Sequence, residues 1–140
     1  MMMIRESRAE WKGSIKEGKG TVRFGSGAFD GAYSWRSRFE DGDGTNPEEL
    51  IGAAHAGCFS MALSNLLTEA NHIPEKIETT AKVHLGQQPK IELIELHTIA
   101  TVPGINEEEF LALAEKAKGG CPVSQALAAV TIKLDAKLLT

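Results

Sequence analysis

A long stretch without charge is the feature that most constrains how this chain folds. No Asp, Glu, Lys or Arg occurs between Leu50 and Thr68, a run of 19 residues in a chain of 140. Its apolar side chains fall on every side of a helix, which is typical of a helix that is buried. Such a helix needs more cover than one small sheet provides, so the sequence predicts burial between two chains.

The residues before this stretch predict where the helix begins. Asn46 is expected to cap it, with Pro47 at the first helical position and Glu49 three residues after the cap. The helix is expected to continue to about Ala70. A membrane span needs about 20 mostly apolar residues, but polar residues and many small ones interrupt this run, so we expect a core helix and no membrane.

Composition narrows the class of protein. A chain of 140 residues fits one domain, residues 1–140, and a hydrophobic content of 42% is enough to bury a core. A net charge of −4 offers no basic patch for nucleic acid. Two cysteines are too few for a secreted disulfide scaffold, and no apolar signal region follows the first residues, so we expect a cytoplasmic protein.

The rest of the pattern predicts an α+β domain with antiparallel sheets packed around central buried helices, in the order β-β-β-α-β-β-α-α-β. Asn106 is expected to cap the second helix, which ends at Gly119 and Gly120, and a short helix follows Cys121 and Pro122. The expected strands are Ser7–Lys12, Lys19–Phe24, Ala32–Glu40, Ile77–Leu85, Ile91–Val102 and Val130–Lys137.

The two cysteines are the first candidates for chemistry. Cys58 lies in the middle of the predicted buried helix, where a cysteine is most often a small core residue, and it needs a nearby cation to become reactive. Arg36 and Arg38 are the candidates for that cation, because they share one face of the expected strand. Cys121 precedes Pro122 at a helix start, where backbone N–H groups favour an anion.

Other chemistries have weaker support. His55 lies three residues before Cys58 on one helix face, which permits a Cys-His pair. The remaining histidines are scattered and no paired short spacing of ligands occurs, so we expect no metal site. Glu48 at the helix start is most simply a residue that complements the helix dipole.

Two motifs resemble the osmotically inducible protein C (OsmC) family, which is related to the organic hydroperoxide resistance proteins. The first is the segment from Thr45 to Leu63, with its Asn-Pro-Glu-Glu start and its Ala-His-Ala-Gly-Cys-Phe-Ser centre; the second is Gly-Cys-Pro-Val-Ser-Gln at residues 120–125. The likeness extends along nearly the whole chain, except for a shorter connection at residues 86–90.

The resemblance implies a thiol-dependent peroxidase that acts on organic hydroperoxides, an antioxidant of the oxidative and osmotic stress response. Cys58 would be the peroxidatic cysteine and Cys121 the resolving cysteine, joined in a disulfide during each turnover. Arg38 and Glu48 would activate and orient the thiolate. The family forms intertwined homodimers with no bound cofactor, and an external dithiol of the lipoyl type, free or on a lipoylated protein, is the associated reductant.

Two further expectations follow. Phe39, Phe59 and Met61 are plausible lining for a pocket that takes the organic tail of the substrate. Glu48 and Cys58 are about 15 Å apart along one continuous helix, so an antiparallel partner would give a composite site, with Cys58 and Cys121 from one subunit and Arg38 and Glu48 from the other.

Two alternatives stay open at this point. One is a non-catalytic dimeric protein that binds an apolar small molecule, with Cys58 in the pocket wall. The other is a Cys-His acyl-transfer enzyme that uses His55, which would leave Cys121 without a role.

Overall fold

The computed structural model describes residues 2–139 and divides into two compact units at the boundary between Leu50 and Ile51. The architecture is α+β, with one three-stranded sheet in each unit. The expectation of one domain over residues 1–140 stays a prediction.

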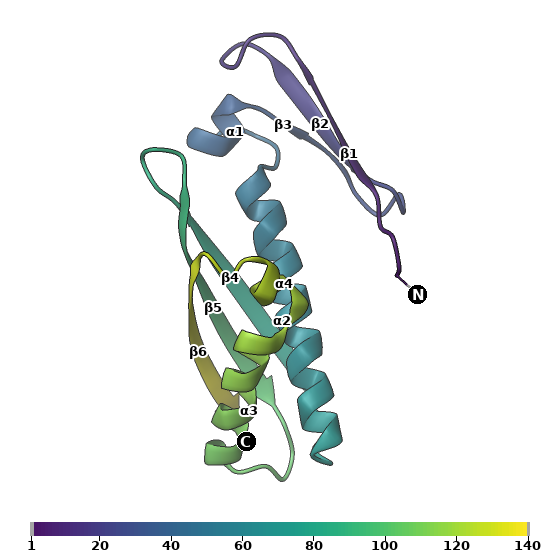
Figure 1. Ribbon diagram of the computed structural model, residues 1–140, viewed down its shortest axis with the longest axis vertical. Coiled ribbons are helices and arrows are strands. Elements are labelled where there is room, and N and C mark those ends of the chain that lie inside the picture. Colours follow the sequence, from purple (N-terminus) through teal and green to yellow (C-terminus); the bar gives the residue numbers. More distant parts are fainter. Residues whose placement is uncertain (1, 140) are drawn as a thin grey trace. The chain divides into compact units, whose positions relative to one another are not determined.

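The N-terminal unit is an antiparallel meander followed by a short helix. Its strands are β1 (Ser7–Lys12), β2 (Lys19–Phe24) and β3 (Asp30–Tyr33), in that order across the sheet. Figure 1 shows them with α1 (Trp35–Phe39), which follows β3 directly. The predicted boundaries of β1 and β2 are confirmed.

The third predicted strand, Ala32–Glu40, is wrong over most of its length. Strand β3 ends at Tyr33, and Ser34 caps helix α1. The Ser37 N–H donates to the Ser34 Oγ atom at 3.1 Å, and the Ser34 N–H donates to the Ser37 Oγ atom at 2.8 Å, so two serines form a reciprocal capping box. Arg36 and Arg38 therefore lie two apart on a helix and do not share a strand face.

Helix α2 (Pro47–Glu69) is the long helix that the uncharged stretch predicts. The Glu49 N–H donates to the Asn46 side chain at 2.7 Å, which confirms the predicted cap. By length and hydropathy alone α2 is long and apolar enough to cross a membrane. Its side chains Phe59, Leu63 and Leu67 are fully buried in a protein core, which favours a core helix.

The C-terminal unit packs helices against one face of a mixed sheet. Strands β4 (Lys76–Leu85) and β5 (Ile91–Thr101) form the predicted antiparallel hairpin, and β6 (Thr131–Leu139) lies parallel to β5. The expected sheet was antiparallel throughout, and the parallel pairing of β6 departs from it. A parallel pairing needs a crossover connection, and helices α3 (Glu107–Gly120) and α4 (Pro122–Ala126) supply it.

The core of the C-terminal unit lies between this sheet and its helices. Strand β5 contributes side chains at every second position, and α2 and α3 contribute one face each. The fully buried apolar side chains from these elements are Phe59, Leu63, Leu67, Ile94, Leu96, Phe110 and Ala114. Cys121, between α3 and α4, belongs to the same core.

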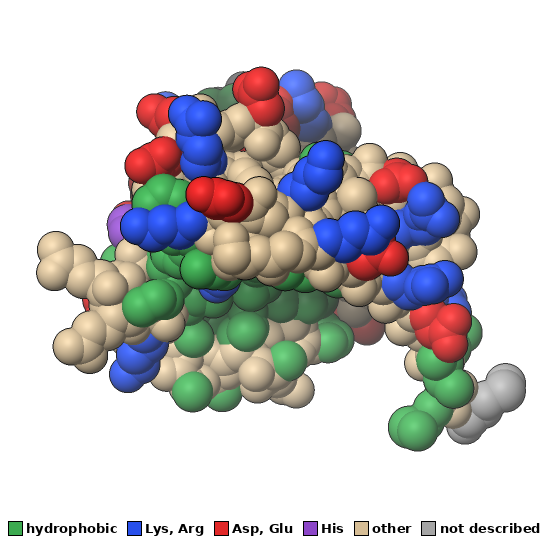
Figure 2. Space-filling model, turned by 90° about the horizontal axis from the view of Figure 1, so that it is seen from above, with side chains coloured by type: hydrophobic (Ala, Val, Ile, Leu, Met, Phe, Trp, Pro, Cys, Tyr) green, Lys and Arg blue, Asp and Glu red, His purple; other side chains and the backbone are tan. Residues whose placement is uncertain are grey.

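Acidic and basic side chains are mixed on the face of the molecule that Figure 2 shows. The N-terminal unit contains local ion pairs, such as Arg23 with Asp30 at 3.0 Å and Arg36 with Glu40 at 3.5 Å. Both pairs are exposed, so each contributes little to stability. The ion pair of Arg38 with Glu48, described below, differs from them because it is short and partly buried.

Replacement of Phe110 tests the core that α3 shares with the sheet. Phe110 is fully buried, whereas its neighbour Leu111 is 42% exposed. Because Phe110→Ala leaves a cavity, we expect it to lower the free energy of unfolding by about 3–5 kcal/mol, measured by urea unfolding. Leu111→Ala is the matched control and should change it by less than about 1 kcal/mol; equal losses in both variants would contradict this packing.

Candidate active site

The C-terminal unit brings the two cysteines together. Cys58 lies on α2 and Cys121 caps the start of α4, and 63 positions in the sequence separate them. The Cys121 side chain neighbours the Cys58 thiol closely enough to affect the pKa of Cys58, and neither cysteine is in a disulfide. The fold therefore brings two cysteines that are distant in the sequence into the same part of the C-terminal unit.

The two thiols differ in exposure. Cys58 is half-buried, whereas Cys121 is only 1% exposed. Burial raises the pKa of the Cys58 thiol, a backbone hydrogen bond from Val123 lowers it, and the neighbouring Cys121 raises it further, with a net shift upward. In the surroundings that this unit supplies, Cys58 is mainly a thiol at neutral pH, and a positive charge beside it would be needed to favour the thiolate.

Cys121 is held by Ser124, three residues further along the chain. The Ser124 N–H donates to the Cys121 sulfur at 3.3 Å, and the Cys121 thiol donates to the Ser124 Oγ atom at 3.1 Å. The Ser124 Oγ atom also lies 2.7 Å from the Nε2 atom of His55 on α2. The predicted cap at Cys121 is therefore present, together with a buried histidine whose connection to it the sequence did not indicate.

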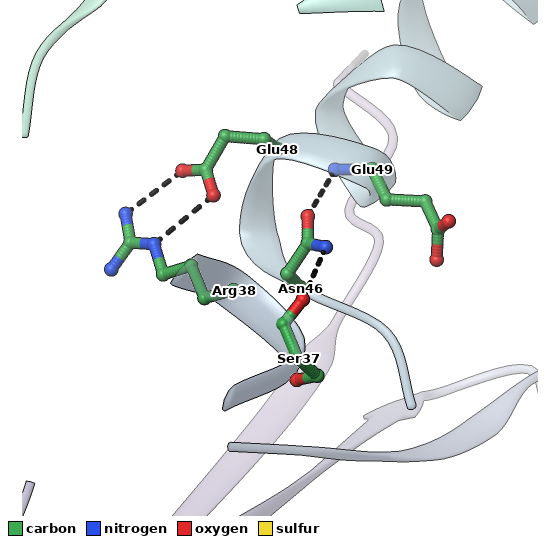
Figure 3. Close-up of polar contacts among 5 residues, drawn as sticks. All are labelled: Ser37, Arg38, Asn46, Glu48 and Glu49. Atoms are coloured by element: carbon green, nitrogen blue, oxygen red, sulfur yellow. Dashed lines mark hydrogen bonds and ion pairs between the residues drawn. The ribbon is translucent and has the colours of Figure 1, made fainter. Parts of the chain in front are cut away.

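The N-terminal unit contains the second group of candidate residues. The Arg38 guanidinium donates from Nε to Glu48 Oε1 at 3.0 Å and from Nη2 to Glu48 Oε2 at 2.8 Å (Figure 3). Two parallel hydrogen bonds to one carboxylate fix the plane of the guanidinium. The hydrogen bond to Glu48 is the main reason that the pKa of Arg38 is raised above its usual value.

Local structure on both sides holds this ion pair. Arg38 lies on α1 and Glu48 in the first turn of α2. Figure 3 shows the Asn46 side chain between the two helices, where it accepts from the Glu49 N–H and donates to the Ser37 carbonyl at 3.0 Å. The Ser37 hydroxyl in turn donates to the Thr45 carbonyl at 2.7 Å. The cap of α2 thus also fixes the helix that carries Arg38.

An apolar hollow of about 240 Å³ lies beside Arg38 in the N-terminal unit. Both tryptophans and the only tyrosine of the chain line it. The full lining is Trp11, Ile15, Tyr33, Ser34, Trp35, Arg38 and Phe39. Such a surface suits an uncharged organic group next to a fixed cation.

The sheet register explains why these aromatic rings meet. Trp11 and Tyr33 both pair with Gly20, on opposite sides of it, and their ring centroids are 5.4 Å apart. A Cβ atom at Gly20 would lie only 2.5 Å from the Tyr33 ring and 2.7 Å from the Trp11 ring. The absence of a side chain at Gly20 therefore allows the two rings to come together. The sequence alone does not indicate this contact, because it depends on the strand register.

The residues expected to line a substrate pocket occupy different surroundings. Phe39 lies in the hollow, Phe59 is fully buried in the core of the C-terminal unit, and Met61 is 76% exposed on α2. A pocket wall formed by these three residues stays a prediction. Among residues 2–139, no group of three or more Cys, His, Asp or Glu is arranged to hold a metal ion.

The described residues form an α+β protein with a neighbouring pair of cysteines in one unit and a bidentate Arg-Glu pair in the other. The OsmC-like protein family matches residues 40–135, so this chain belongs to that family. Peroxiredoxin OsmC of Escherichia coli is 49% identical over 142 residues, with 99% of each chain covered. The organic hydroperoxide resistance protein of Xanthomonas axonopodis is 35% identical over 86 residues, 61% of each chain.

Solved structures agree with the fold. An organic hydroperoxide resistance protein from Elizabethkingia anophelis superposes with a TM-score of 0.73 at 27% identity and covers 99% of this chain and 100% of its own. An OsmC-like protein from Mycoplasma pneumoniae reaches a TM-score of 0.77 at 15% identity, with both chains covered fully. The predicted OsmC-like α+β fold is thereby confirmed.

The closeness of the two cysteines predicts a specific product on oxidation. A thiol-specific oxidant such as diamide should join Cys58 to Cys121 within one chain, because the folded C-terminal unit already holds the two side chains together. Peptide mapping by mass spectrometry would show one crosslinked peptide pair that has lost two hydrogen atoms. The same treatment in denaturant is the control, and an equal yield of the intramolecular disulfide there would contradict the geometry.

Proposed function

We propose that this protein is a cysteine-based peroxidase that reduces organic hydroperoxides to alcohols. The observation that carries the proposal is the neighbouring pair of thiols, one half-exposed and one buried. The relatives give further support, because Peroxiredoxin OsmC is 49% identical over nearly the full length and the Xanthomonas and Elizabethkingia proteins are named for organic hydroperoxide resistance. Both candidate cysteines lie in the C-terminal unit.

The chemistry balances with these residues. The Cys58 thiolate attacks the terminal oxygen of the hydroperoxide, the O–O bond breaks, and the alkoxide leaves and is protonated to an alcohol. Cys58 is then a sulfenic acid. The Cys121 thiolate attacks its sulfur and forms the Cys58–Cys121 disulfide, with water as the second product. An external dithiol of the lipoyl type, free or on a lipoylated protein, restores both thiols by two exchange steps and is itself oxidised.

Arg38 and Glu48 supply what Cys58 lacks in its own unit. Burial raises the pKa of the Cys58 thiol, and a guanidinium next to the sulfur would favour the thiolate. Glu48 holds Arg38 through two hydrogen bonds, so the cation is presented in one fixed orientation. The aromatic hollow beside Arg38 would take the organic part of the hydroperoxide, a contact that hydrogen peroxide cannot make.

The site is proposed to be shared between the two subunits of a homodimer. Helix α2 is continuous from Pro47 to Glu69, which separates positions 48 and 58 by about 15 Å along its axis. An antiparallel copy of α2 would place the partner's Glu48 and Arg38 at Cys58. Between Leu50 and Thr68 the surface of α2 is uncharged and partly exposed, which is suited to such packing. We also propose that the protein acts in the cytoplasm, where reductants reopen the disulfide.

A second candidate function is a dimeric binding protein for an apolar small molecule, and the aromatic hollow favours it. This alternative assigns no role to the pairing of Cys58 with Cys121. Ligand binding without consumption would be its signature. The turnover experiment below separates the two candidates, because a binding protein does not consume hydroperoxide.

Loss of Cys58 and loss of Cys121 should each stop turnover, but at different steps. With cumene hydroperoxide or tert-butyl hydroperoxide and dihydrolipoamide, Cys58→Ser should lower the rate of hydroperoxide consumption by at least about a hundredfold, because the nucleophile is absent. Cys121→Ser should still consume about one equivalent and then stall as a sulfenic acid. Unchanged steady-state turnover in Cys58→Ser would rule out the proposed peroxidase.

Mixed dimers test whether the site is shared. Arg38→Ala and Cys58→Ser should each be nearly inactive alone. A heterodimer of the two variants, purified through two different tags, should regain about half the wild-type activity, because one of its two sites then contains both Cys58 and Arg38. Each variant paired with itself is the control. A heterodimer as inactive as its parents would place Arg38 and Cys58 of each site in the same chain.

A further inference from the structure

The proposed mechanism leaves one buried titratable group unused, which is His55. Its side chain is fully buried, and its Nε2 atom lies 2.7 Å from the Ser124 Oγ atom. Ser124 is 4% exposed and also contacts the Cys121 sulfur at 3.1 Å through the same oxygen. Histidine, serine and cysteine thus form a continuous chain of hydrogen bonds that leads from α2 to the start of α4.

The surroundings of His55 define its protonation. Burial lowers the pKa of His55, so the ring is neutral at neutral pH and carries one N–H proton. The Nδ1 atom is buried and has no hydrogen-bond partner among the described residues. The proton therefore belongs on Nε2, where the Ser124 oxygen accepts it.

This tautomer has a consequence for Ser124. Once the Ser124 oxygen accepts from His55, its own hydroxyl proton is free to turn toward the Cys121 sulfur. A Cys121 thiolate would then receive two hydrogen bonds from one residue, from the Ser124 hydroxyl and from the Ser124 N–H at 3.3 Å. Hydrogen bonds to an ionised acceptor are stronger than those between neutral groups. The titratable groups that face Cys121 are Cys58 directly and His55 through Ser124.

We propose that His55 and Ser124 are positioning residues for the resolving step, in which they stabilise the Cys121 thiolate that attacks the Cys58 sulfenic acid. The inference rests on the proposed peroxidase function. In that step the sulfur–sulfur bond forms, the sulfur–oxygen bond of the sulfenic acid breaks, and the released hydroxide takes up a proton to become water. His55 stays neutral throughout and acts only by fixing the direction of the Ser124 hydroxyl.

The same contacts act when the disulfide is reopened. Cys121 is 1% exposed and Cys58 is half-buried, so an incoming dithiol meets the Cys58 sulfur first. Attack there makes Cys121 the leaving group. A leaving thiolate that already has hydrogen-bond donors in place departs faster. His55 and Ser124 therefore also serve the reductive half of the cycle.

The test separates oxidation of Cys58 from resolution by Cys121. In single-turnover experiments with cumene hydroperoxide, Ser124→Ala and His55→Leu should oxidise Cys58 at the wild-type rate but form the disulfide roughly tenfold more slowly. Dimedone trapping would show a longer-lived sulfenic acid. The pH at which resolution reaches half its maximal rate should move upward, which a purely structural role would not cause.

Three further variants make the outcome decisive. His55→Gln keeps an N–H donor toward Ser124 and should restore much of the lost rate. Ser60→Ala is the matched control, since it removes a serine hydroxyl hydrogen bond of 2.7 Å to Thr79 on the same unit and should leave resolution unchanged. In Cys58→Ser protein, the ultraviolet absorbance of the Cys121 thiolate should develop at higher pH when Ser124 is replaced by alanine.

The outcomes distinguish this inference from the proposed function. A thiolate absorbance in Cys58→Ser protein that is insensitive to Ser124→Ala would overturn the inference, whatever the peroxidase assay gives. Slower oxidation of Cys58 with unaffected resolution would also overturn it, because His55 would then serve Cys58. Should His55→Leu fail to fold, Ser124→Ala decides alone, since it removes a single buried oxygen.

Discussion

Burial of a helix that carries no charge between Leu50 and Thr68 is the constraint on which the rest of this structure depends. A helix with one polar side can lie on a protein surface, whereas α2 has apolar side chains all round and must be covered. The C-terminal sheet and α3 cover the part that contains Phe59, Leu63 and Leu67. The same packing brings Cys121 against α2. The burial of hydrophobic side chains is therefore also what places Cys121 beside Cys58.

Position within this packing gives the two cysteines different properties. Cys121 belongs to the core and is fixed by Ser124, whereas Cys58 lies at the edge of the core and remains partly accessible. A thiol in the core is protected from bulk reagents and has a rigid geometry. A thiol at the edge can meet a substrate. The division of labour that we propose for them follows from where each lies relative to the same apolar cluster.

Local signals in the sequence were sufficient for much of the fold. Asn46 and Asn106 act as the caps that their spacing predicts, and β1 and β2 have the predicted bounds. The short helix α1 was missed because the alternation of Trp35, Arg36 and Ser37 fits a strand as well as it fits five residues of helix, and only the capping box decides between them. The parallel pairing of β6 depends on a crossover that no local pattern specifies.

The candidate site likewise has parts that the sequence predicts and parts that only the structure reveals. The resemblance predicts Cys58, Cys121, Arg38 and Glu48 as candidates, and the structure adds the bidentate geometry of Arg38 with Glu48. The contact of His55 with Ser124 joins residues 69 positions apart in the sequence, and the aromatic hollow depends on how three strands pair across Gly20. Both arise from contacts between distant segments, which a single sequence does not display.

The crossover between β5 and β6 has a consequence for how the redox pair comes into being. Cys121 lies inside that connection, so its place beside α2 depends on the packing of α3 and α4 in the core. In an unfolded chain, a separation of 63 residues keeps the effective concentration of one sulfur near the other low. The folded C-terminal unit raises it greatly. The capacity for internal disulfide exchange is thus a property of the folded C-terminal unit and is largely absent from the unfolded chain.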